Sequence, residues 1–317
     1  MVGFDIGGTK CAVTVGEIQN GTLRILKKKV MPTDHGTTPY KMIDRMCRTA
    51  MEMTNDFSYV GISCGGPLDS HEGVILSPPN LPGWDHVEIV RFVEEKLGGK
   101  VALQNDANAC ALAEWRYGAG RGCRNMIFLT FGTGLGAGLI LGGQLYEGTN
   151  DMAGEVGHLR LSAFGPIGYG KSGSFEGFCS GSGLAQLGKI YATEQLQKGN
   201  AVSYCKDRSE LSQVNAKKLA QYAYDGEEDA CRVYEICGEK LGEGLAFLVD
   251  ILNPEKIILG SIYQRSEQLL KKAMLRTLRA EALPRSLEVC EIVPAALGDQ
   301  IGDYAALSVA AEQRNGE

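Results

Sequence analysis

Long apolar runs and an excess of basic residues are both absent from this sequence. No apolar stretch reaches the ~18 residues that a membrane-spanning helix needs. The chain carries 32 Lys and Arg against 38 Asp and Glu, a net charge of -6. It therefore lacks the basic balance that is typical of nucleic-acid-binding proteins. We expect neither a membrane nor a nucleic acid as its partner.

Zinc-binding patterns of cysteine and histidine are also missing. None of the ten cysteines forms a C-x-x-C pair, and the chain has only four histidines, which argues against a structural zinc site. The chain opens directly on an apolar strand, MVGFDI, without the basic region and small-residue cleavage site of a secretory signal. The cysteines are therefore expected to be reduced thiols of a cytoplasmic protein.

Glycine, by contrast, is abundant at 42 of 317 residues. Such an excess indicates many tight turns, or many places where the backbone approaches a ligand closely. The length suffices for two domains, because single hydrophobic cores stop growing near ~250 to 300 residues. We expect an N-terminal α/β domain over residues 1–116 and a larger C-terminal α/β domain over 117–299. A helix within 300–317 is expected to pack back on the first domain.

The order strand, glycine turn, strand occurs twice. Residues 1–6 predict a strand, the turn Gly7-Gly8-Thr9-Lys10 follows, and residues 11–15 predict a second strand. Residues 126–131, the turn at 132–136 and residues 137–141 repeat this order. Two copies of one α/β unit are the simplest interpretation.

Periodicity predicts the remaining elements. Strands are expected at 23–31, 59–64, 101–104 and 256–259. Helices are expected from Pro39 to about Met51, and at 87–97, 107–117, 182–197, 216–224, 227–252, 264–280 and 302–312.

The first turn, in FDIGGTK, has the composition of a phosphate-binding loop. Its glycines let backbone N–H groups approach phosphate oxygens, and Asp5 can hold a metal ion through water. A plain hairpin turn is the alternative. The second turn, FGTGLGAG, contains the spacing of a dinucleotide fingerprint, but the strand-like GLILGGQLYEG follows where that motif needs a helix. We therefore reject a Rossmann fold.

A third glycine-rich segment, GPIGYGKS at residues 165–172, matches the phosphate-loop pattern G-x-x-x-x-G-K-[ST]. A true phosphate loop needs a helix that starts at its Lys-Ser pair. The following GSFEGFCSG has three glycines in nine residues and is not expected to begin a stable helix. We interpret the match as accidental.

Taken together, the motifs resemble the ROK family of sugar kinases and repressors, within the actin-like ATPase superfamily. The resemblance covers essentially the whole chain and is carried, in order, by FDIGGTK, PNLPGW, QNDANACALAEW, FGTGLGAG, GEVGHL and NPEKIILGS. It implies an α/β fold of duplicated actin-like ATPase (ribonuclease H-like) domains with an interdomain cleft. It also implies an ATP- and Mg²⁺-dependent kinase that acts as a homodimer.

The resemblance also implies roles for individual residues. Asp106 would be the general base that accepts the proton of a sugar hydroxyl, although a strand-end Asp can also cap the next helix. Sugar would be bound by Gly66, Asn80, Asn105, Glu155, His158 and Glu176. ATP would be bound by Asp5, Gly7, Gly8, Thr9, Lys10, Gly132, Thr133, Gly134 and Gly260, with Asp5 holding Mg²⁺ through water.

One departure from the family pattern concerns zinc. Three cysteines of the family motif that follows the Gly-His pair correspond here to Ile167, Tyr169 and Ser174, so no bound zinc is expected. Gly170, Gly173 and Glu176 of that motif remain. We hypothesise a zinc-free loop held by the packing of Ile167, Tyr169 and Phe175. The other histidines, His35, His71 and His86, are interpreted as solvated loop residues.

Several functions are compatible with this pattern. The leading one is phosphorylation of a hexose, with glucose as the default by resemblance. N-acetylmannosamine or another N-acetylhexosamine is the alternative substrate. A sugar-responsive regulator is the alternative class, but the chain begins at its first strand, where such regulators carry a DNA-binding domain. A catalytically silent sugar-binding protein is disfavoured because Asp106 and both glycine turns are present.

Overall fold

The structure, a computed structural model, describes residues 1–315 of the chain. Contacts between Cα atoms group the chain into two compact units. Unit 1 comprises Met1–Arg124, Gly138–Ala153 and Ala296–Glu317, and unit 2 comprises Asn125–Ala137 and Gly154–Ala295. The sequence-based division places residues 117–124, 138–153 and 296–299 in the C-terminal domain, whereas they group here with unit 1.

The first sheet has five strands in the order β3-β2-β1-β4-β8. Strand β2 pairs antiparallel with β1 and β3, whereas β4 pairs parallel with β1 and β8. Buried apolar side chains of these strands and of helices α1 and α2 form one core cluster. The bounds are β1 Val2–Ile6, β2 Lys10–Gln19, β3 Thr22–Pro32, α1 Pro39–Met53, β4 Tyr59–Cys64, α2 Ile89–Leu97 and β8 Lys100–Asn105.

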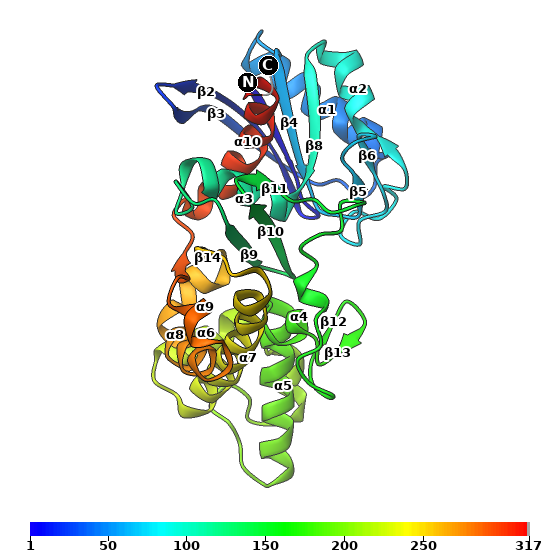
Figure 1. Ribbon diagram of the computed structural model, residues 1–317. Coiled ribbons are helices and arrows are strands. Elements are labelled where there is room, and N and C mark those ends of the chain that lie inside the picture. Colours follow the sequence, from blue (N-terminus) through cyan, green and yellow to red (C-terminus); the bar gives the residue numbers. More distant parts are fainter. Residues whose placement is uncertain (316–317) are drawn as a thin grey trace. The chain divides into compact units, whose positions relative to one another are not determined.

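Helix α10 (Ile301–Asn315) packs on the same sheet, beside β4 in Figure 1. Small residues permit the close approach, because a Cβ at Gly61 would overlap the carbonyl oxygen of Ala306. The buried Asp303 fixes the helix to the sheet. Its carboxylate accepts hydrogen bonds from the Thr14 hydroxyl at 3.0 Å and from Lys28 Nζ at 2.6 Å.

The second sheet repeats the topology of the first, with the order β11-β10-β9-β14-β15. In this sheet β14 pairs parallel with β9 and β15, as β4 does with β1 and β8, and β10 pairs antiparallel with β11. The predicted duplication is confirmed. The bounds are β9 Met126–Phe131, β10 Leu135–Leu141, β11 Gln144–Leu145, β14 Lys256–Leu259 and β15 Glu291–Pro294.

The remaining long helices agree closely with the periodicity of the sequence. They are α3 Asp106–Tyr117, α5 Gly181–Gln197, α6 Ala216–Tyr224, α7 Glu228–Leu252 and α8 Ile262–Glu281. The short helices α4 Phe175–Phe178 and α9 Pro284–Leu287 were not predicted. The helix predicted from residue 87 begins at Ile89, because Val87–Glu88 form strand β7. That strand completes a small antiparallel sheet with β5 (Leu68–Asp69) and β6 (Val74–Ile75). No helix of the described chain is long and apolar enough to span a membrane.

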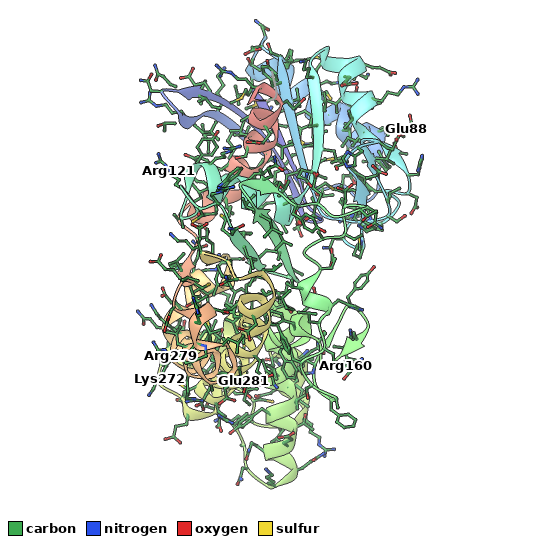
Figure 2. All side chains as sticks on the ribbon, in the orientation of Figure 1. Glu88, Arg121, Arg160, Lys272, Arg279 and Glu281 are labelled. Atoms are coloured by element: carbon green, nitrogen blue, oxygen red, sulfur yellow. The ribbon has the colours of Figure 1, made fainter. Side chains whose placement is uncertain are left out.

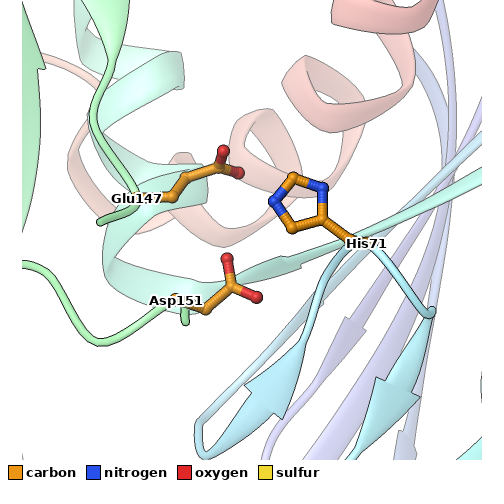
Figure 3. A group of neighbouring side chains, drawn as sticks. All are labelled: His71, Glu147 and Asp151. Atoms are coloured by element: carbon orange, nitrogen blue, oxygen red, sulfur yellow. The ribbon is translucent and has the colours of Figure 1, made fainter. Parts of the chain in front are cut away.

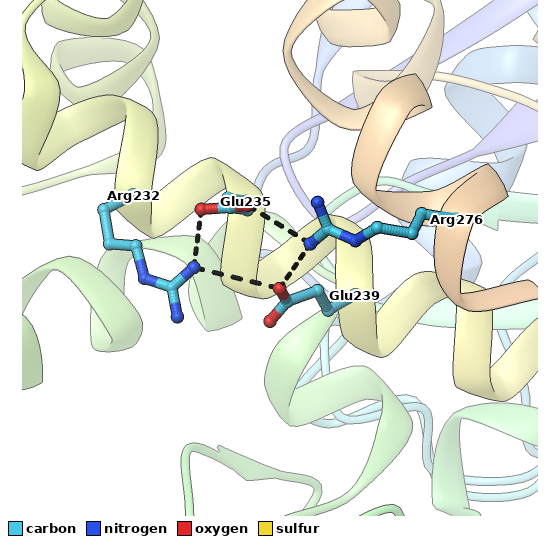
Figure 4. A network of polar contacts seen from close by, with 4 residues as sticks. All are labelled: Arg232, Glu235, Glu239 and Arg276. Carbon is cyan, nitrogen blue, oxygen red and sulfur yellow. Dashed lines mark hydrogen bonds and ion pairs between the residues drawn. The ribbon is translucent and has the colours of Figure 1, made fainter. Parts of the chain in front are cut away.

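Helices α7 and α8 pack closely in unit 2. Gly238 and Gly242 of α7 face the backbone of α8, and a Cβ on Gly242 would lie 2.5 Å from the carbonyl oxygen of Met274. Four charged side chains, Arg232, Glu235, Glu239 and Arg276, link the two helices by ion pairs (Figure 4). Other charged side chains of α8, labelled in Figure 2, are exposed: Lys272, Arg279 and Glu281.

Candidate active site

Asp106 stands where strand β8 ends and helix α3 begins. Asn105 is the N-cap, and its Oδ1 accepts a hydrogen bond from the Ala107 N–H at 2.9 Å. Asp106 Oδ1 accepts from the same N–H at 2.8 Å. Asp106 Oδ2 lies near Gly65, where a Cβ would be 3.9 Å away, so the cap engages only one of its oxygens. The side chain is exposed to solvent, yet desolvation by the surrounding protein raises the pKa of its carboxyl.

Gln104 fixes the backbone and side chains around this carboxylate. Its Oε1 accepts hydrogen bonds from the Asn105 N–H at 2.8 Å and from Asn108 Nδ2 at 3.1 Å, and its Nε2 donates to Glu147 at 2.6 Å. Gly66 lies beside Asn105, since a Cβ there would be 3.1 Å from Asn105 Nδ2. Sequence reasoning missed Gln104, although its place at the buried end of a strand was a signal.

The first glycine turn, residues 7–10, is anchored from strand β3 and the loop after it. The Gly7 N–H donates to the Lys10 carbonyl at 3.1 Å, and the Thr33 hydroxyl donates to the Gly7 carbonyl at 2.6 Å. His35 Nε2 contacts the Gly8 carbonyl at 2.7 Å, which requires its proton on Nε2. His35 is an exposed loop residue, as predicted, and it also holds this turn.

At Gly8 the first glycine turn contacts the segment PNLPGW, residues 79–84. A Cβ on Gly8 would lie 2.5 Å from the carbonyl oxygen of Asn80, so only glycine fits this approach. Two residues that the sequence assigned to different ligands, Gly8 and Asn80, are thus in contact. The Asn80 side chain is exposed.

Asp5 is crowded by other carboxylates. Burial raises the pKa of its carboxyl to about 6, and the negative charges of Asp106 and Asp303 act in the same direction, against Lys10 and Lys28. A Cβ on Gly302, at the start of α10, would lie 2.7 Å from Asp5 Oδ2. A group of carboxylates of this kind suits a hard cation such as Mg²⁺, which prefers oxygen ligands. That Gly302 and Asp303 lie close to Asp5 was not predicted from the sequence.

Backbone hydrogen bonds within unit 2 fix the second glycine turn, residues 132–136. The Gly132 N–H donates to the Gly134 carbonyl at 3.0 Å, and the Gly132 carbonyl accepts from the Gly181 N–H at 2.8 Å. The half-buried Glu176 reaches the same turn, because its Oε2 accepts from the Leu135 N–H at 3.1 Å. A Cβ on Gly134 would lie 2.7 Å from that oxygen. The turn thus positions a carboxylate as well as backbone groups.

The remaining predicted site residues of unit 2 flank these elements. Glu155 immediately precedes the 3₁₀ turn Val156–His158, and both Glu155 and His158 are exposed. The His158 carbonyl accepts from Lys171 Nζ at 2.6 Å, and its ring lies edge-on to Tyr169 at 6.4 Å between centroids. Gly260 follows strand β14, where a Cβ would lie 2.8 Å from the Phe128 ring.

The comparisons with known proteins agree with this geometry. The model of the ROK family matches residues 1–313. The chain belongs to the ROK family. It is 28% identical to a glucokinase of Thermotoga maritima over 319 residues, covering 100% of this chain and 98% of the relative. It is 31% identical to a glucokinase of Halalkalibacterium halodurans over 314 residues, covering 95% and 92%.

The fold of this chain is also similar to that of a solved ROK structure. The crystal structure of a ROK family glucokinase from Streptomyces griseus, in complex with glucose and AMPPNP, matches with a TM-score of 0.79 and 29% identity. The match covers 98% of this chain and 99% of that one. The fold is that of the actin-like ATPases, as the sequence predicted.

The segment GPIGYGKS of this ROK chain is not a phosphate loop. Lys171–Ser172 form strand β13, which pairs with β12 (Ile167–Gly168), so no helix starts at the Lys-Ser pair. The expectation that no helix begins in GSFEGFCSG was nevertheless wrong. The single-turn helix α4 starts at Phe175, because the Ser174 hydroxyl accepts from the Gly177 N–H at 3.1 Å and caps it.

The prediction that packing of Ile167, Tyr169 and Phe175 holds this loop is wrong for two of the three residues. Phe175 is fully buried, but Ile167 and Tyr169 are 54% and 74% exposed and cannot hold the loop by packing. Hydrogen bonds do so instead. The Ile167 backbone N–H and carbonyl both bond to the Gln186 side chain, at 2.9 and 2.8 Å.

Proposed function

We propose that this ROK chain is an ATP-dependent hexose kinase in which Asp106 is the general base. The observation that carries the proposal is the position of the Asp106 carboxylate at the end of β8, with one oxygen outside the helix cap. Its raised pKa supports the same role, because a carboxyl with a raised pKa binds a proton more readily. The glucokinase relatives support the reaction class.

In the proposed reaction, Asp106 orients the sugar hydroxyl by accepting its hydrogen bond. The hydroxyl oxygen forms a bond to the γ-phosphorus of ATP while the bond to the β,γ-bridging oxygen breaks, and the hydroxyl proton passes to the carboxylate. The phosphoryl transition state is loose, so positioning provides most of the acceleration. The rigid support of Asp106 by Asn105 and Gln104 fits this requirement.

The other site residues are proposed to bind the two substrates. In unit 1, the sugar is bound by Gly66, Asn80 and Asn105, and in unit 2 by Glu155, His158 and Glu176. ATP phosphates are bound in unit 1 by residues 7–10 and in unit 2 by residues 132–134, with adenosine near Gly260. Asp5 would hold Mg²⁺ through water, and the ion would supply positive charge to the phosphates.

The substrate, the oligomeric state and the location of the protein are also part of the proposal. Glucose is the proposed substrate, since the related Streptomyces griseus enzyme was crystallised with glucose. We propose a homodimer, as in the family, and a cytoplasmic location, which the ten free thiols favour. No zinc is proposed in the loop at residues 165–174, because positions 167, 169 and 174 offer no thiolate.

A coupled assay of ADP release across hexoses and N-acetylhexosamines tests the proposal. We expect turnover with glucose, and a loss of kcat on the order of 10²- to 10⁴-fold in Asp106→Asn, with glucose affinity retained. The matched control Asp225→Asn changes an exposed carboxylate on another helix end and should leave kcat unchanged. If only N-acetylmannosamine is turned over, it replaces glucose as the proposed substrate. Full activity in Asp106→Asn would overturn the mechanism.

A further inference from the structure

A His and two carboxylates of unit 1 converge outside the proposed active site. His71 lies in the turn between β5 and β6, and Glu147 and Asp151 lie in the segment after β11. One potential ligand atom from each lies within 4.8 Å of the other two, and Figure 3 shows both carboxylates pointing toward the ring. Among the described residues this is the one group of this kind. The sequence interpretation of His71 as a solvated residue did not foresee it.

Within residues 1–315, the two carboxylates of this group accept hydrogen bonds only from neutral donors. Asp151 is only 8% exposed, and its carboxylate accepts hydrogen bonds from the N–H and the hydroxyl of Ser70, at 2.7 and 2.8 Å. These donors are neutral. No ion pair to Glu147 or Asp151 occurs within the part of the chain that the structure describes. A buried carboxylate beside a second one is costly unless a cation is present.

The spacing of the three atoms suits an ion rather than direct hydrogen bonds. His71 forms no ion pair of 4.0 Å or less with either carboxylate within residues 1–315. Because the three atoms lie within 4.8 Å of one another, a point exists that is at most ~2.8 Å from all of them, and a small inward movement gives the ~2.0–2.2 Å bonds of a transition metal.

Residues behind the group hold the two carboxylates in place. Glu147 accepts from Gln104 Nε2 at 2.6 Å, and Asp151 is held by Ser70, the residue next to His71. Such outer hydrogen bonds orient metal ligands in known sites. Here they come from different segments, the end of β8 and the turn after β5, so the carboxylates are positioned independently of each other.

We infer that His71, Glu147 and Asp151 form a binding site for a divalent first-row transition metal, distinct from the Mg²⁺ of the kinase reaction. One imidazole with two carboxylates is a donor set for Zn²⁺, Mn²⁺ or Fe²⁺, whereas Mg²⁺ and Ca²⁺ prefer oxygen ligands alone. Bound metal would join the turn after β5 to the segment after β11. Its role is structural, because none of the three residues is in the proposed catalytic machinery.

Zn²⁺ binding by the full-length chain, stripped with EDTA and dialysed, tests this site without any measurement of kinase activity. Calorimetry should give one Zn²⁺ per chain, and Zn²⁺ should raise the Tm. His71→Asn should weaken binding at least ~10-fold. Asp151→Asn should do the same, and it retains a side chain that tolerates the positive φ of this residue. The matched control His86→Asn, in a nearby exposed loop, should bind as the wild type does.

Three outcomes would overturn the inference. One is that the wild type binds no more Zn²⁺ than His71→Asn does, with circular dichroism showing both folded. Another is that Zn²⁺ binding survives in both His71→Asn and Asp151→Asn. The third is that binding is lost in His158→Asn and kept in His71→Asn, which would assign the zinc to the loop at residues 165–174.

Discussion

Three acidic residues of unit 1 show how differently this fold surrounds its carboxylates. Glu114 is fully buried and accepts hydrogen bonds from three backbone N–H groups at 2.7 to 3.2 Å. Asp303 pairs with Lys28 and accepts from Thr14. Asp5 has no such hydrogen-bond partner in the described part of the chain, and its pKa rises to about 6. Within residues 1–315, the carboxylate that we propose for Mg²⁺ is therefore the one of the three that no protein group donates to.

Asp5→Asn should stabilise the protein in the absence of ligands at pH 8 while abolishing kinase activity. Because the folded pKa of about 6 lies above the unfolded value, the folded state binds the extra proton between about pH 4 and pH 6, and stability is lost as pH rises through that window. The substitution removes this cost. We expect a gain on the order of 1–2 kcal/mol at pH 8 and none at pH 4.

Urea unfolding at both pH values measures this effect. Asp225→Asn, at an exposed position, is the matched control and should show no difference between pH 4 and pH 8 beyond that of the wild type. Equal stability of Asp5→Asn and wild type at pH 8 would contradict the assigned desolvation of Asp5.

At the scale of elements, close packing and surface charge contribute unequally to the contact between α7 and α8. The glycines at 238 and 242 set how near the two helices come, since any Cβ there meets the α8 backbone. The ion pairs of Arg276 with Glu235 and Glu239 lie on half-exposed side chains (Figure 4). Ion pairs of this kind are usually worth little, because water and salt screen them.

Gly242→Ala should therefore destabilise the protein more than Arg276→Ala. Alanine favours a helix over glycine, but its Cβ would lie 2.5 Å from a backbone oxygen that cannot move freely, so overpacking decides the sign. We expect a loss of about 1–3 kcal/mol for Gly242→Ala and at most ~1 kcal/mol for Arg276→Ala. Denaturant unfolding measures both, and the reverse order would refute the packing argument.

The elements were largely predictable, but the contacts that build the site were not. Helix α6 and strands β4, β9 and β14 have the bounds that periodicity predicted, because local pattern and burial agree in them. Strands β5 to β7 were missed, since two-residue pairings leave no periodic signal. Proximities such as Gly8 to Asn80 and Gln104 to Glu147 join segments distant in sequence, and periodicity carries no information about them.

At the scale of the whole molecule, substrates should stabilise the folded chain by mass action. Glucose or AMPPNP at ~100 times its Kd adds about 2.7 kcal/mol, because each binds only the folded state. We expect the Tm to rise with each, and galactitol, which lacks a ring, to give no shift. A thermal-shift titration measures this. No rise with any hexose, N-acetylhexosamine or nucleotide would contradict the kinase proposal.

The return of α10 to the first sheet has a consequence for synthesis on the ribosome. Gly3 and Gly61, near the start of the chain, are shaped to receive residues 306–310, and Asp303 completes the charge pairing of Lys28. While translation proceeds, one face of the earliest strands remains uncovered until the residues of α10 have been made. Nascent chains that stall late would thus present apolar β-structure to chaperones, so a premature stop codon near residue 300 should yield aggregates rather than a shortened enzyme.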